Sequence, residues 1–335
     1  IKSAHASAEP GLLFWDTAKK TTPSDIYSDE GFGSISTNPC GEIILSPYDS
    51  CRLMLVNLVS FVKNPWAEKS EFDYSMFASV VQKAQRLMDD MIDLEIEQID
   101  KIIRKIKDDP EPEDVKRIEL DLWSKVRHAA INGRRTGLGI TGLGDTLAML
   151  GNTYGSDTAI TTTEEIYKWL TLNSYESSIQ LAKERGPFPI WQAEKETGHI
   201  FIKRILKELL PHRRGDYLKY GRRNIANTTT APAGSVSVLT QTTSGIEPAF
   251  MLHYLRRRKI SNVDEVACID FIDDSGDKWQ EYTVYHHNFQ AWMNHMTESD
   301  SDIFVNMTDD EIVAMSPYSG ATANVSAITV GSKNI

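Results

Sequence analysis

The longest regular pattern of apolar positions begins near Phe72. From there apolar side chains recur every three or four residues, which is the spacing of one face of a helix. The recurring residues are Phe77, Val80, Val81, Ala84, Leu87, Met88, Met91 and Ile92. The pattern predicts a long helix whose stripe of Met and Leu packs into a core. Residues 104–117 are charged and interrupted by prolines, so we expect an exposed connection there.

Helical and strand-like segments alternate through the rest of the chain. Thr162 and Glu165 have the spacing of a capping box, which predicts a helix from there to about Arg185, where a Gly-Pro pair ends it. A shorter helix is expected over residues 199–210, and a buried strand within residues 43–62. Short runs rich in Val, Ile and Leu that alternate with helices predict an α/β fold with mainly parallel strands.

The composition is that of an ordinary soluble globular chain, with 41% hydrophobic and 25% charged residues. A length of 335 residues can hold about two average domains or one α/β barrel. The formal net charge of −11 argues against non-specific binding to a nucleic-acid polymer or an anionic membrane. No apolar run is long enough to span a membrane, and no signal peptide is evident. Three cysteines do not make a disulfide framework and suit a reducing cytoplasm.

Reactive side chains concentrate in residues 36–42, Ser-Thr-Asn-Pro-Cys-Gly-Glu. The proline and the glycine predict a shaped loop, and in an extended loop alternate side chains face the same way. Asn38, Cys40 and Glu42 are therefore expected to project into one pocket. They would supply an amide that holds a hydroxyl, a sulfur that reacts and a carboxylate that takes a proton.

A second cysteine, Cys51, follows eleven residues after Cys40. Taken alone, a cysteine in a loop rich in Pro and Gly is often a buried small hydrophobe. A zinc half-site would need more cysteine or histidine ligands, and the nearest histidines, His5 and His128, are remote in sequence. Local chemistry therefore leaves the buried and the reactive interpretations open.

Three other segments invite a binding interpretation. Asp89, Asp90 and Asp93 could suggest a metal site, although a solvated acidic face or hydrogen bonds between helices also account for them. Residues 137–142 have the letters G-x-G-x-x-G, but a dinucleotide site needs a preceding strand, and a helix followed by a turn is predicted there instead. Residues 231–237 lead from a β-like run of threonines into a predicted helix, whose free N–H groups could bind phosphate. An ordinary strand–turn–helix would explain the same residues.

A family resemblance bears on these alternatives. Asn-Pro-Cys-Gly-Glu at residues 38–42, followed by Pro-Tyr-x-Ser-Cys-x-Leu at 47–53, resembles the radical-cysteine loop of ribonucleotide reductases, most closely that of the adenosylcobalamin-dependent class II. The other matching segments are Glu9–Asp16, Gly133–Gly139 and Ala231–Ser237, the last followed by Ser244–Pro248. The ordered signatures cover roughly residues 9 to 258, and their combination is specific.

The resemblance implies a fold and its parts. Residues 1–335 would form part of the ten-stranded α/β barrel of the ribonucleotide reductase and glycyl-radical type. A helical insertion is expected at about residues 70–130, the radical-cysteine loop near residues 36–51 and a phosphate-binding turn at residues 231–237. The N-terminal effector region and the C-terminal tail of the family would be absent.

The resemblance also implies roles for single residues. Cys40 would carry a thiyl radical that removes the 3′ hydrogen of a ribonucleotide, and Glu42 would take the 3′-hydroxyl proton as general base. Asn38 would hold the sugar hydroxyls, and Cys51 would be one of two thiols that close a disulfide. The substrate would contact Asn38, Pro39, Cys40, Gly41 and Glu42 in the loop and, through its diphosphate, Pro232, Ala233, Gly234, Ser235 and Val236. Cys268 matches no family cysteine and is expected to be structural.

The implied cofactor is adenosylcobalamin, although no motif for binding it is visible. The alternative is a class I large subunit that receives its radical from a separate metal-bearing subunit through paired tyrosines, and no Tyr-Tyr pair occurs in this chain. A non-catalytic, nucleotide-binding paralogue or structural fragment is a further alternative. The other implied partners are a thioredoxin- or glutaredoxin-type reductant and, for the complete enzyme, a second copy.

The chain is expected to be one piece of a longer enzyme. It begins at Ile1 inside a family signature, and the upstream cysteine that should pair with Cys51 is not in it. We therefore expect a complementary chain that carries the N-terminal part of the family.

Overall fold

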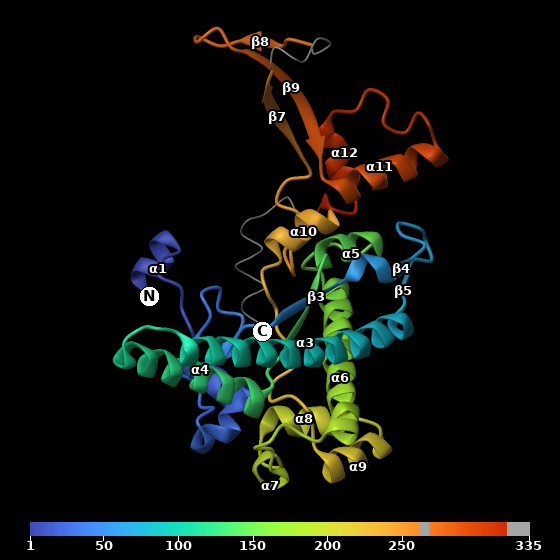
Figure 1. Ribbon diagram of the computed structural model, residues 1–335. Coiled ribbons are helices and arrows are strands. Elements are labelled where there is room, and N and C mark those ends of the chain that lie inside the picture. Colours follow the sequence, from blue (N-terminus) through green and yellow to red (C-terminus); the bar gives the residue numbers. More distant parts are fainter. Residues whose placement is uncertain (261–267, 320–335) are drawn as a thin grey trace. The chain divides into compact units, whose positions relative to one another are not determined.

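The computed structural model describes residues 1–260 and 268–319 (Figure 1). The described residues divide into two compact units. Unit 1 comprises Ile1–Val56, Tyr74–Ile140 and Glu165–Pro232. Unit 2 comprises Asn57–Asp73, Thr141–Glu164 and the described residues from Ala233 onward. Each unit is described by itself below.

Helices make up most of unit 1. They are α1 (Lys2–Ser7), α2 (Trp15–Thr21), the 3₁₀ helix η1 (Pro23–Glu30), α3 (Tyr74–Asp108), α4 (Glu113–Gly133), α6 (Asp157–Arg185), α7 (Ala193–Glu196), α8 (Ile200–Glu208) and α9 (Pro211–Tyr220). The first turns of α6 belong to unit 2. The helix predicted over residues 199–210 is confirmed as α8, whereas α9 was not predicted.

The long helix predicted from Phe72 is confirmed as α3, and its core stripe is confirmed in part. Phe77, Met88 and Ile92 are fully buried, as the apolar periodicity predicts. Leu87 and Met91 are 54% and 41% exposed, so their assignment to the core was wrong. The apolar stripe of α3 is wider than the face that the rest of the described chain covers.

The start predicted for α6 was also wrong. The helix begins at Asp157, where the Ser156 hydroxyl accepts a hydrogen bond from the N–H of Ala159 at 3.2 Å and so caps the first turn. Thr162 therefore lies inside the helix, and its hydroxyl accepts a hydrogen bond from Asn152 Nδ2 at 3.1 Å. The end of the helix at Arg185 is as predicted.

Three lengths of extended chain lie side by side in unit 1. β3 (Leu53–Asn57) neighbours β6 (Gly137–Thr141), and Leu138 of β6 forms a parallel bridge with Thr228. A Cβ at Gly139 would lie 2.9 Å from Leu55 Cδ2 and 2.9 Å from the Thr229 carbonyl oxygen. Glycine is therefore required for this close approach.

The prediction of mainly parallel strands is wrong for the described residues. Among the described strands, four antiparallel pairings join β1 (Ser36–Thr37) to β2 (Ile44–Leu45), β4 (Val62–Lys63) to β5 (Glu71–Phe72), and β9 (Lys278–Tyr285) to both β7 (His253–Lys259) and β8 (Phe271–Ile272). Strands that follow one another through short connections pair antiparallel. The single strand expected within residues 43–62 is divided between β2, β3 and the 3₁₀ helix η2 (Leu58–Phe61). The described strands do not close into a barrel.

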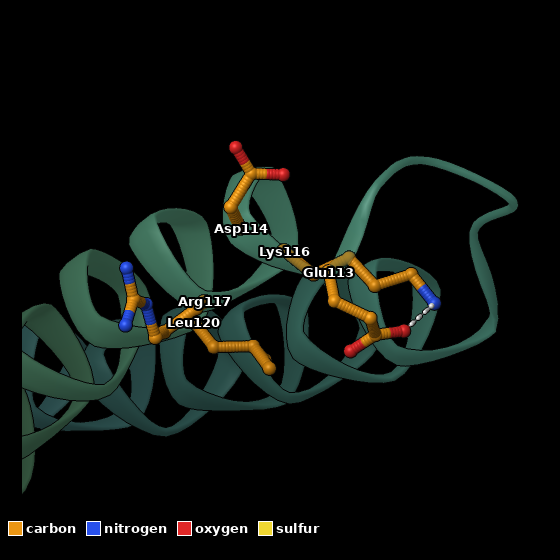
Figure 2. Close-up of a pocket in the computed structure, with 5 residues that line it drawn as sticks. All are labelled: Glu113, Asp114, Lys116, Arg117 and Leu120. Atoms are coloured by element: carbon orange, nitrogen blue, oxygen red, sulfur yellow. Dashed lines mark hydrogen bonds and ion pairs between the residues drawn. The ribbon is translucent and has the colours of Figure 1, made fainter.

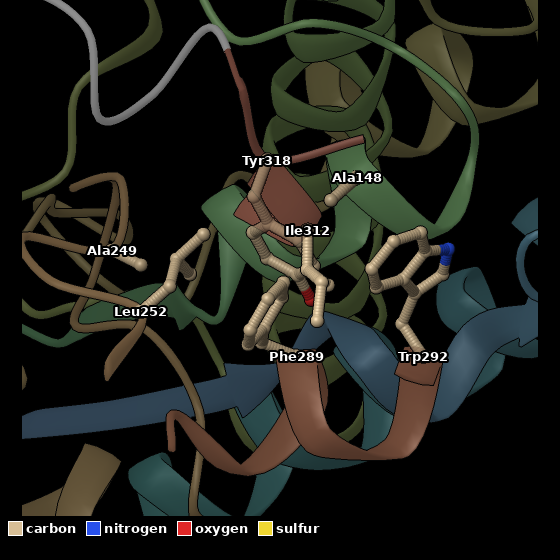
Figure 3. Packing of buried hydrophobic residues seen from close by; sticks show 7 residues of the cluster. All are labelled: Ala148, Ala249, Leu252, Phe289, Trp292, Ile312 and Tyr318. Atoms are coloured by element: carbon tan, nitrogen blue, oxygen red, sulfur yellow. The ribbon is translucent and has the colours of Figure 1, made fainter. Parts of the chain in front are cut away.

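Unit 2 is organised around an aromatic core. Its helices are α5 (Leu143–Met149), α10 (Gly234–Thr240), α11 (His287–Ser299) and α12 (Asp309–Met315). Figure 3 shows the buried cluster of Ala148, Ala249, Leu252, Phe289, Trp292, Ile312 and Tyr318. Phe289 lies edge-on to Tyr318 and stacks on Trp292, with ring centroids 6.0 and 5.6 Å apart. Such pairs stabilise a core beyond the area that they bury.

A buried carboxylate joins separate segments of unit 2. Asp145 on α5 is fully buried, and its Oδ1 receives hydrogen bonds from His286 Nε2 at 2.7 Å and from the Tyr318 hydroxyl at 3.0 Å. Its Oδ2 receives the N–H of Thr243 at 2.7 Å and Asn288 Nδ2 at 2.9 Å. His286 is thus held by a hydrogen bond to this buried carboxylate.

A further buried carboxylate, that of Glu196, holds segments of unit 1 together. Glu196 is fully buried and binds the Arg222 guanidinium and the hydroxyls of Tyr27 and Tyr217. Burial by itself raises the pKa of Glu196, but Arg222 and the two tyrosine hydroxyls outweigh it, so the pKa lies below its usual range.

In the described residues, none of the helices is both long enough and apolar enough for a transmembrane span.

Candidate functional site

The loop at residues 38–42 is a tight turn that closes the β1–β2 hairpin. The N–H of Gly41 donates to the Asn38 carbonyl oxygen at 3.0 Å, and Gly41 has a φ of +80°, which favours glycine. The Asn38 side-chain oxygen accepts the N–H of Ile43 at 3.0 Å. The loop is therefore not extended, and the premise that alternate side chains face one way was wrong.

The three predicted side chains differ in their exposure. Cys40 is exposed, which excludes the interpretation as a buried small hydrophobe. Glu42 is partly buried, and its Oε2 is buried without a hydrogen-bond partner among the described residues. Asn38 is half-buried, and the turn uses its side-chain oxygen, while its amide nitrogen donates no hydrogen bond within the part of the chain that the structure describes. A carboxylate oxygen that is buried without a hydrogen-bond partner loses its hydration, and this costs free energy unless a ligand supplies a hydrogen bond in place of water.

Glu42 is held in place through its backbone. The Thr229 hydroxyl donates to the Glu42 carbonyl oxygen at 2.9 Å. Thr229 directly follows Thr228, which bridges to Leu138 of β6. The hairpin loop is thereby attached to the segment that bridges in parallel to β6.

Cys51 shares the electrostatic environment of this loop. Burial raises the pKa of the Cys51 thiol, and the nearby carboxylate of Glu42 raises it further. Arg135 acts in the opposite direction, while Asp49 and Cys40 again raise the pKa. Glu42 and Cys40 thus lie close enough to Cys51 to influence its thiol.

The sequence interpretation assigned no role to the charged residues beside Cys51. The buried side chain of Asp49 pairs with Arg135, and that of Arg52 pairs with Glu95. Thr229 was likewise not recognised as a residue that holds Glu42. The sequence held one signal for these ion pairs, because charged residues stand inside motifs of otherwise apolar or small residues. A charge that is buried within such a motif needs a partner of opposite charge.

The predicted phosphate-binding turn leads into α10, as expected. Ala233 is the N-cap of α10, and no side chain caps the helix. A Cβ at Gly234 would meet nothing within 4 Å, so the surface there is open. Ala233–Val236 belong to unit 2 and the loop at residues 38–42 to unit 1. The expectation that one substrate contacts both the loop and this turn therefore stays a prediction.

The acidic residues of α3 make ion pairs. Asp89 is fully buried and binds Arg134, with 2.8 Å between Asp89 Oδ1 and Arg134 Nε, and it also binds Arg185 and Arg223. Asp93 pairs with Arg134 at 2.8 Å. A solvated face was therefore the wrong interpretation for Asp89. Within the described ranges, no group of three or more His, Cys, Asp or Glu side chains could hold a metal ion.

Two other features contribute nothing to the candidate site. A surface hollow at the start of α4 is lined by Glu113, Asp114, Lys116, Arg117 and Leu120 (Figure 2). Glu113 and Lys116 pair with each other across 3.3 Å, and none of the predicted site residues lines the hollow. Cys268 is exposed, so it is not a core cysteine.

Comparisons with known proteins identify the family. Residues 1–305 match the family described as ribonucleotide reductase, barrel domain. The chain therefore belongs to the ribonucleotide reductase barrel-domain family.

Two relatives carry the same description. The vitamin B12-dependent ribonucleoside-diphosphate reductase of Mycobacterium tuberculosis is 31% identical over 257 residues, which cover 76% of this chain and 29% of the relative. The protein of that description from Thermoplasma acidophilum is 31% identical over 259 residues, covering 76% of this chain and 27% of the relative. The chain spans less than a third of the length of these relatives.

A solved structure supports the fold. The class Id ribonucleotide reductase alpha subunit of Actinobacillus ureae matches with a TM-score of 0.53 and 18% identity, covering 96% of this chain and 47% of that one. The barrel-type fold of the family is thus supported, although the described strands do not form a closed barrel.

Proposed function

We propose that this chain is the catalytic part of a ribonucleotide reductase that converts ribonucleoside diphosphates to 2′-deoxyribonucleotides. The observation that carries the proposal is that Glu42 and Cys40 both act on the Cys51 thiol, while the Cys40 sulfur is exposed and one Glu42 oxygen is buried without a partner among the described residues. That arrangement, in a chain of this family, fits a reaction in which a ribose meets Cys40 and supplies the missing hydrogen bond to Glu42.

The reaction would begin and end at Cys40. A thiyl radical on Cys40 removes the 3′ hydrogen atom, Glu42 takes the 3′-hydroxyl proton, and the 2′-hydroxyl leaves as water with a proton from one of two reducing thiols. These two thiols, one of them Cys51, give two electrons and two protons in all and become a disulfide, and Glu42 returns its proton to the 3′ oxygen. Cys40 returns a hydrogen atom to the 3′ carbon. Asn38 would orient the sugar through its amide nitrogen.

We assign adenosylcobalamin as the source of the radical, because relatives described as vitamin B12-dependent match the chain. When bound, this cofactor supplies the one-electron chemistry that no side chain provides by itself. The part of the chain suited to meet it is Cys40, whose sulfur is exposed. A separate metal-bearing radical subunit is the alternative source.

The complete enzyme would contain more than this chain. We place the chain within the ten-stranded barrel of the family, with residues 70–130 as a helical insertion. A chain with the family's N-terminal part would supply the thiol that pairs with Cys51, and an external thioredoxin- or glutaredoxin-type dithiol would reopen the disulfide. The assembled enzyme would act in the cytoplasm as a homodimer.

The chain by itself is therefore expected to reduce no ribonucleotide. The mechanism needs two reducing thiols besides the radical cysteine, and Cys268, the third cysteine, is exposed and outside every matched motif. The purified chain is assayed with adenosylcobalamin, a dithiol and each ribonucleotide, with and without a complementary chain. Multiple turnovers by the chain alone would contradict the prediction. Absence of turnover with every complement tested would favour a non-catalytic nucleotide-binding protein.

The diphosphate is expected to bind the N–H groups of Ala233 to Val236. Gly234→Asp should weaken the binding of a ribonucleoside diphosphate to the assembled enzyme by about tenfold or more, because a carboxylate repels the phosphates. Gly234→Asn is the matched control, since it adds similar bulk without charge. Titration of the nucleotide at fixed salt measures both variants. Equal affinities for the Asp and Asn variants would show that no phosphate lies there.

A further inference from the structure

Two sequence motifs that the proposed mechanism leaves partly unused meet beside Cys51. Asp49 lies two residues before Cys51. Arg135 lies 86 residues after Asp49, in the Gly-Arg-Arg-Thr-Gly-Leu-Gly motif. Arg135 Nε donates a hydrogen bond to Asp49 Oδ2. Their side chains are only 3% and 1% exposed, respectively. A buried ion pair therefore ties the Cys51 segment to the turn that precedes β6.

Further contacts hold the backbone on both sides of Cys51. Asp49 Oδ1 accepts the N–H of Ser50 at 2.8 Å, and Arg52 Nη1 lies 3.7 Å from the same oxygen. Arg52 Nη1 also donates to the carbonyl oxygen of Arg135 at 3.1 Å. The residues immediately before and after Cys51 are thus both bound to the Asp49–Arg135 pair.

The charges that act on Cys51 have opposite signs. The carboxylates of Glu42 and Asp49, together with Cys40, disfavour a negative charge on its sulfur, whereas the guanidinium of Arg135 favours it. Arg135 and Asp49 are paired with each other, so the removal of either one exposes Cys51 to the uncompensated charge of the other.

We propose that Arg135 is a positioning residue for Cys51, and that its guanidinium, balanced by Asp49, stabilises the Cys51 sulfur when it becomes a thiolate. The proposal rests on the proposed function, because this matters to catalysis only if Cys51 is oxidised in each turnover. When an external dithiol reopens the disulfide, its thiolate attacks the sulfur bonded to Cys51. The S–S bond then breaks, and the Cys51 sulfur leaves with the electron pair. A nearby cation makes that sulfur a better leaving group.

The test follows the reactivity of Cys51 in the full chain. Cys40→Ser and Cys268→Ser leave Cys51 as the only thiol, and its alkylation by iodoacetamide is measured against pH. The Cys51 thiolate forms the S–C bond and iodide leaves, so the rate reports the thiolate fraction. Arg135→Gln should slow alkylation at pH 8 by about threefold to tenfold and move the pH midpoint upward. Asp49→Asn should accelerate alkylation by a similar factor and move the midpoint downward.

Opposite signs separate an electrostatic role from a merely structural one. Both substitutions break the same ion pair, so a loosened loop would shift both pH midpoints in the same direction. Either a shift of both midpoints in one direction or two unchanged midpoints would overturn the proposal. Arg135→Lys keeps the charge and should hold the pH midpoint near that of the parent. If Arg135→Gln does not fold, the other two variants decide: the midpoint of Asp49→Asn should lie below that of Arg135→Lys, and the reverse order would overturn the proposal. Arg134→Gln is the matched control, because it breaks the neighbouring pair with Asp89 and should leave the midpoint unchanged.

The failure of this proposal and the failure of the proposed function have different signatures. The alkylation series concerns only the thiol and needs no cofactor or substrate. Cys51→Ser in the assembled enzyme tests the proposed function. Continued turnover by that variant would remove Cys51 from the mechanism without changing the alkylation result.

Discussion

Cys40→Ser is expected to reduce ribonucleotide turnover by the assembled enzyme on the order of a thousandfold or more. A serine hydroxyl has nearly the same shape as the thiol, but its O–H bond is too strong for a reversible exchange of hydrogen atoms with the 3′ carbon. Cys40 is exposed at the tip of a hairpin turn, so the substitution should leave the fold unchanged. Turnover is measured as deoxynucleotide formed per enzyme in the presence of adenosylcobalamin and a dithiol.

The matched control for Cys40 is Cys268→Ser. Cys268 is also exposed but lies outside every family motif, so this variant should keep the turnover of the parent. If Cys40→Ser and Cys268→Ser were equally active, Cys40 would not be the radical site. If both were equally inactive, the loss would come from a general sensitivity to substitution rather than from the chemistry of Cys40.

Glu196→Gln is expected to lower the free energy of unfolding by about 3–5 kcal/mol. Arg222 and Glu196 are both fully buried, and Arg222 Nη2 lies 2.6 Å from Glu196 Oε1. The substitution leaves the charge of Arg222 buried without its counter-charge, and it also weakens the hydrogen bonds from Tyr27 and Tyr217. Urea denaturation followed by circular dichroism measures the loss.

An exposed ion pair of the same unit provides the comparison. Lys168 and Glu208 are 46% and 41% exposed, so Glu208→Gln should cost less than about 1 kcal/mol. A loss of similar size in the two variants would contradict the importance assigned to burial.

The contribution of Glu196 should also depend on pH. Its pKa in the folded chain lies below the usual value, so its stabilisation is present above the pKa of an unfolded glutamate. That stabilisation is lost as the pH falls through the lower pKa of the folded chain. The parent and Glu196→Gln should therefore converge in stability toward acid pH.

The sequence suggested candidate site residues but not the geometry of their loop. The family motifs pointed to Cys40, Glu42 and Cys51 as candidates, and Glu42 and Cys40 lie close enough to Cys51 to act on its thiol. The alternation argument failed because Gly41 allows a tight turn, which Asn38 closes with its own side chain. Whether a short Pro-Gly segment is extended or turned depends on the strands that flank it, and two-residue strands leave no pattern in the sequence.

The periodicity of apolar residues predicted the positions of helices better than it predicted which of their side chains are buried. It located α3, yet Leu87 and Met91 are exposed while Asp89 is fully buried. Burial of Asp89 depends on arginines at positions 134, 185 and 223, which meet it only in the folded chain. The pairing of Asp49 with Arg135 was hidden for the same reason, because long-range charge pairing has no signature in local spacing.

The helical hairpin of α3 and α4 has a consequence for how the reactive loop assembles. Asp49 and Arg135 are 86 residues apart, and closing so long a loop from a free chain costs conformational entropy. Arg127 pairs with Asp100 and Arg134 with Asp89, so α4 runs back along α3 as far as Asp89 (Figure 1). Local helix contacts form quickly, and this hairpin shortens the distance that the chain must still search. A pair of helices that contributes no reacting atom would thereby set how fast the Cys51 segment reaches its native position.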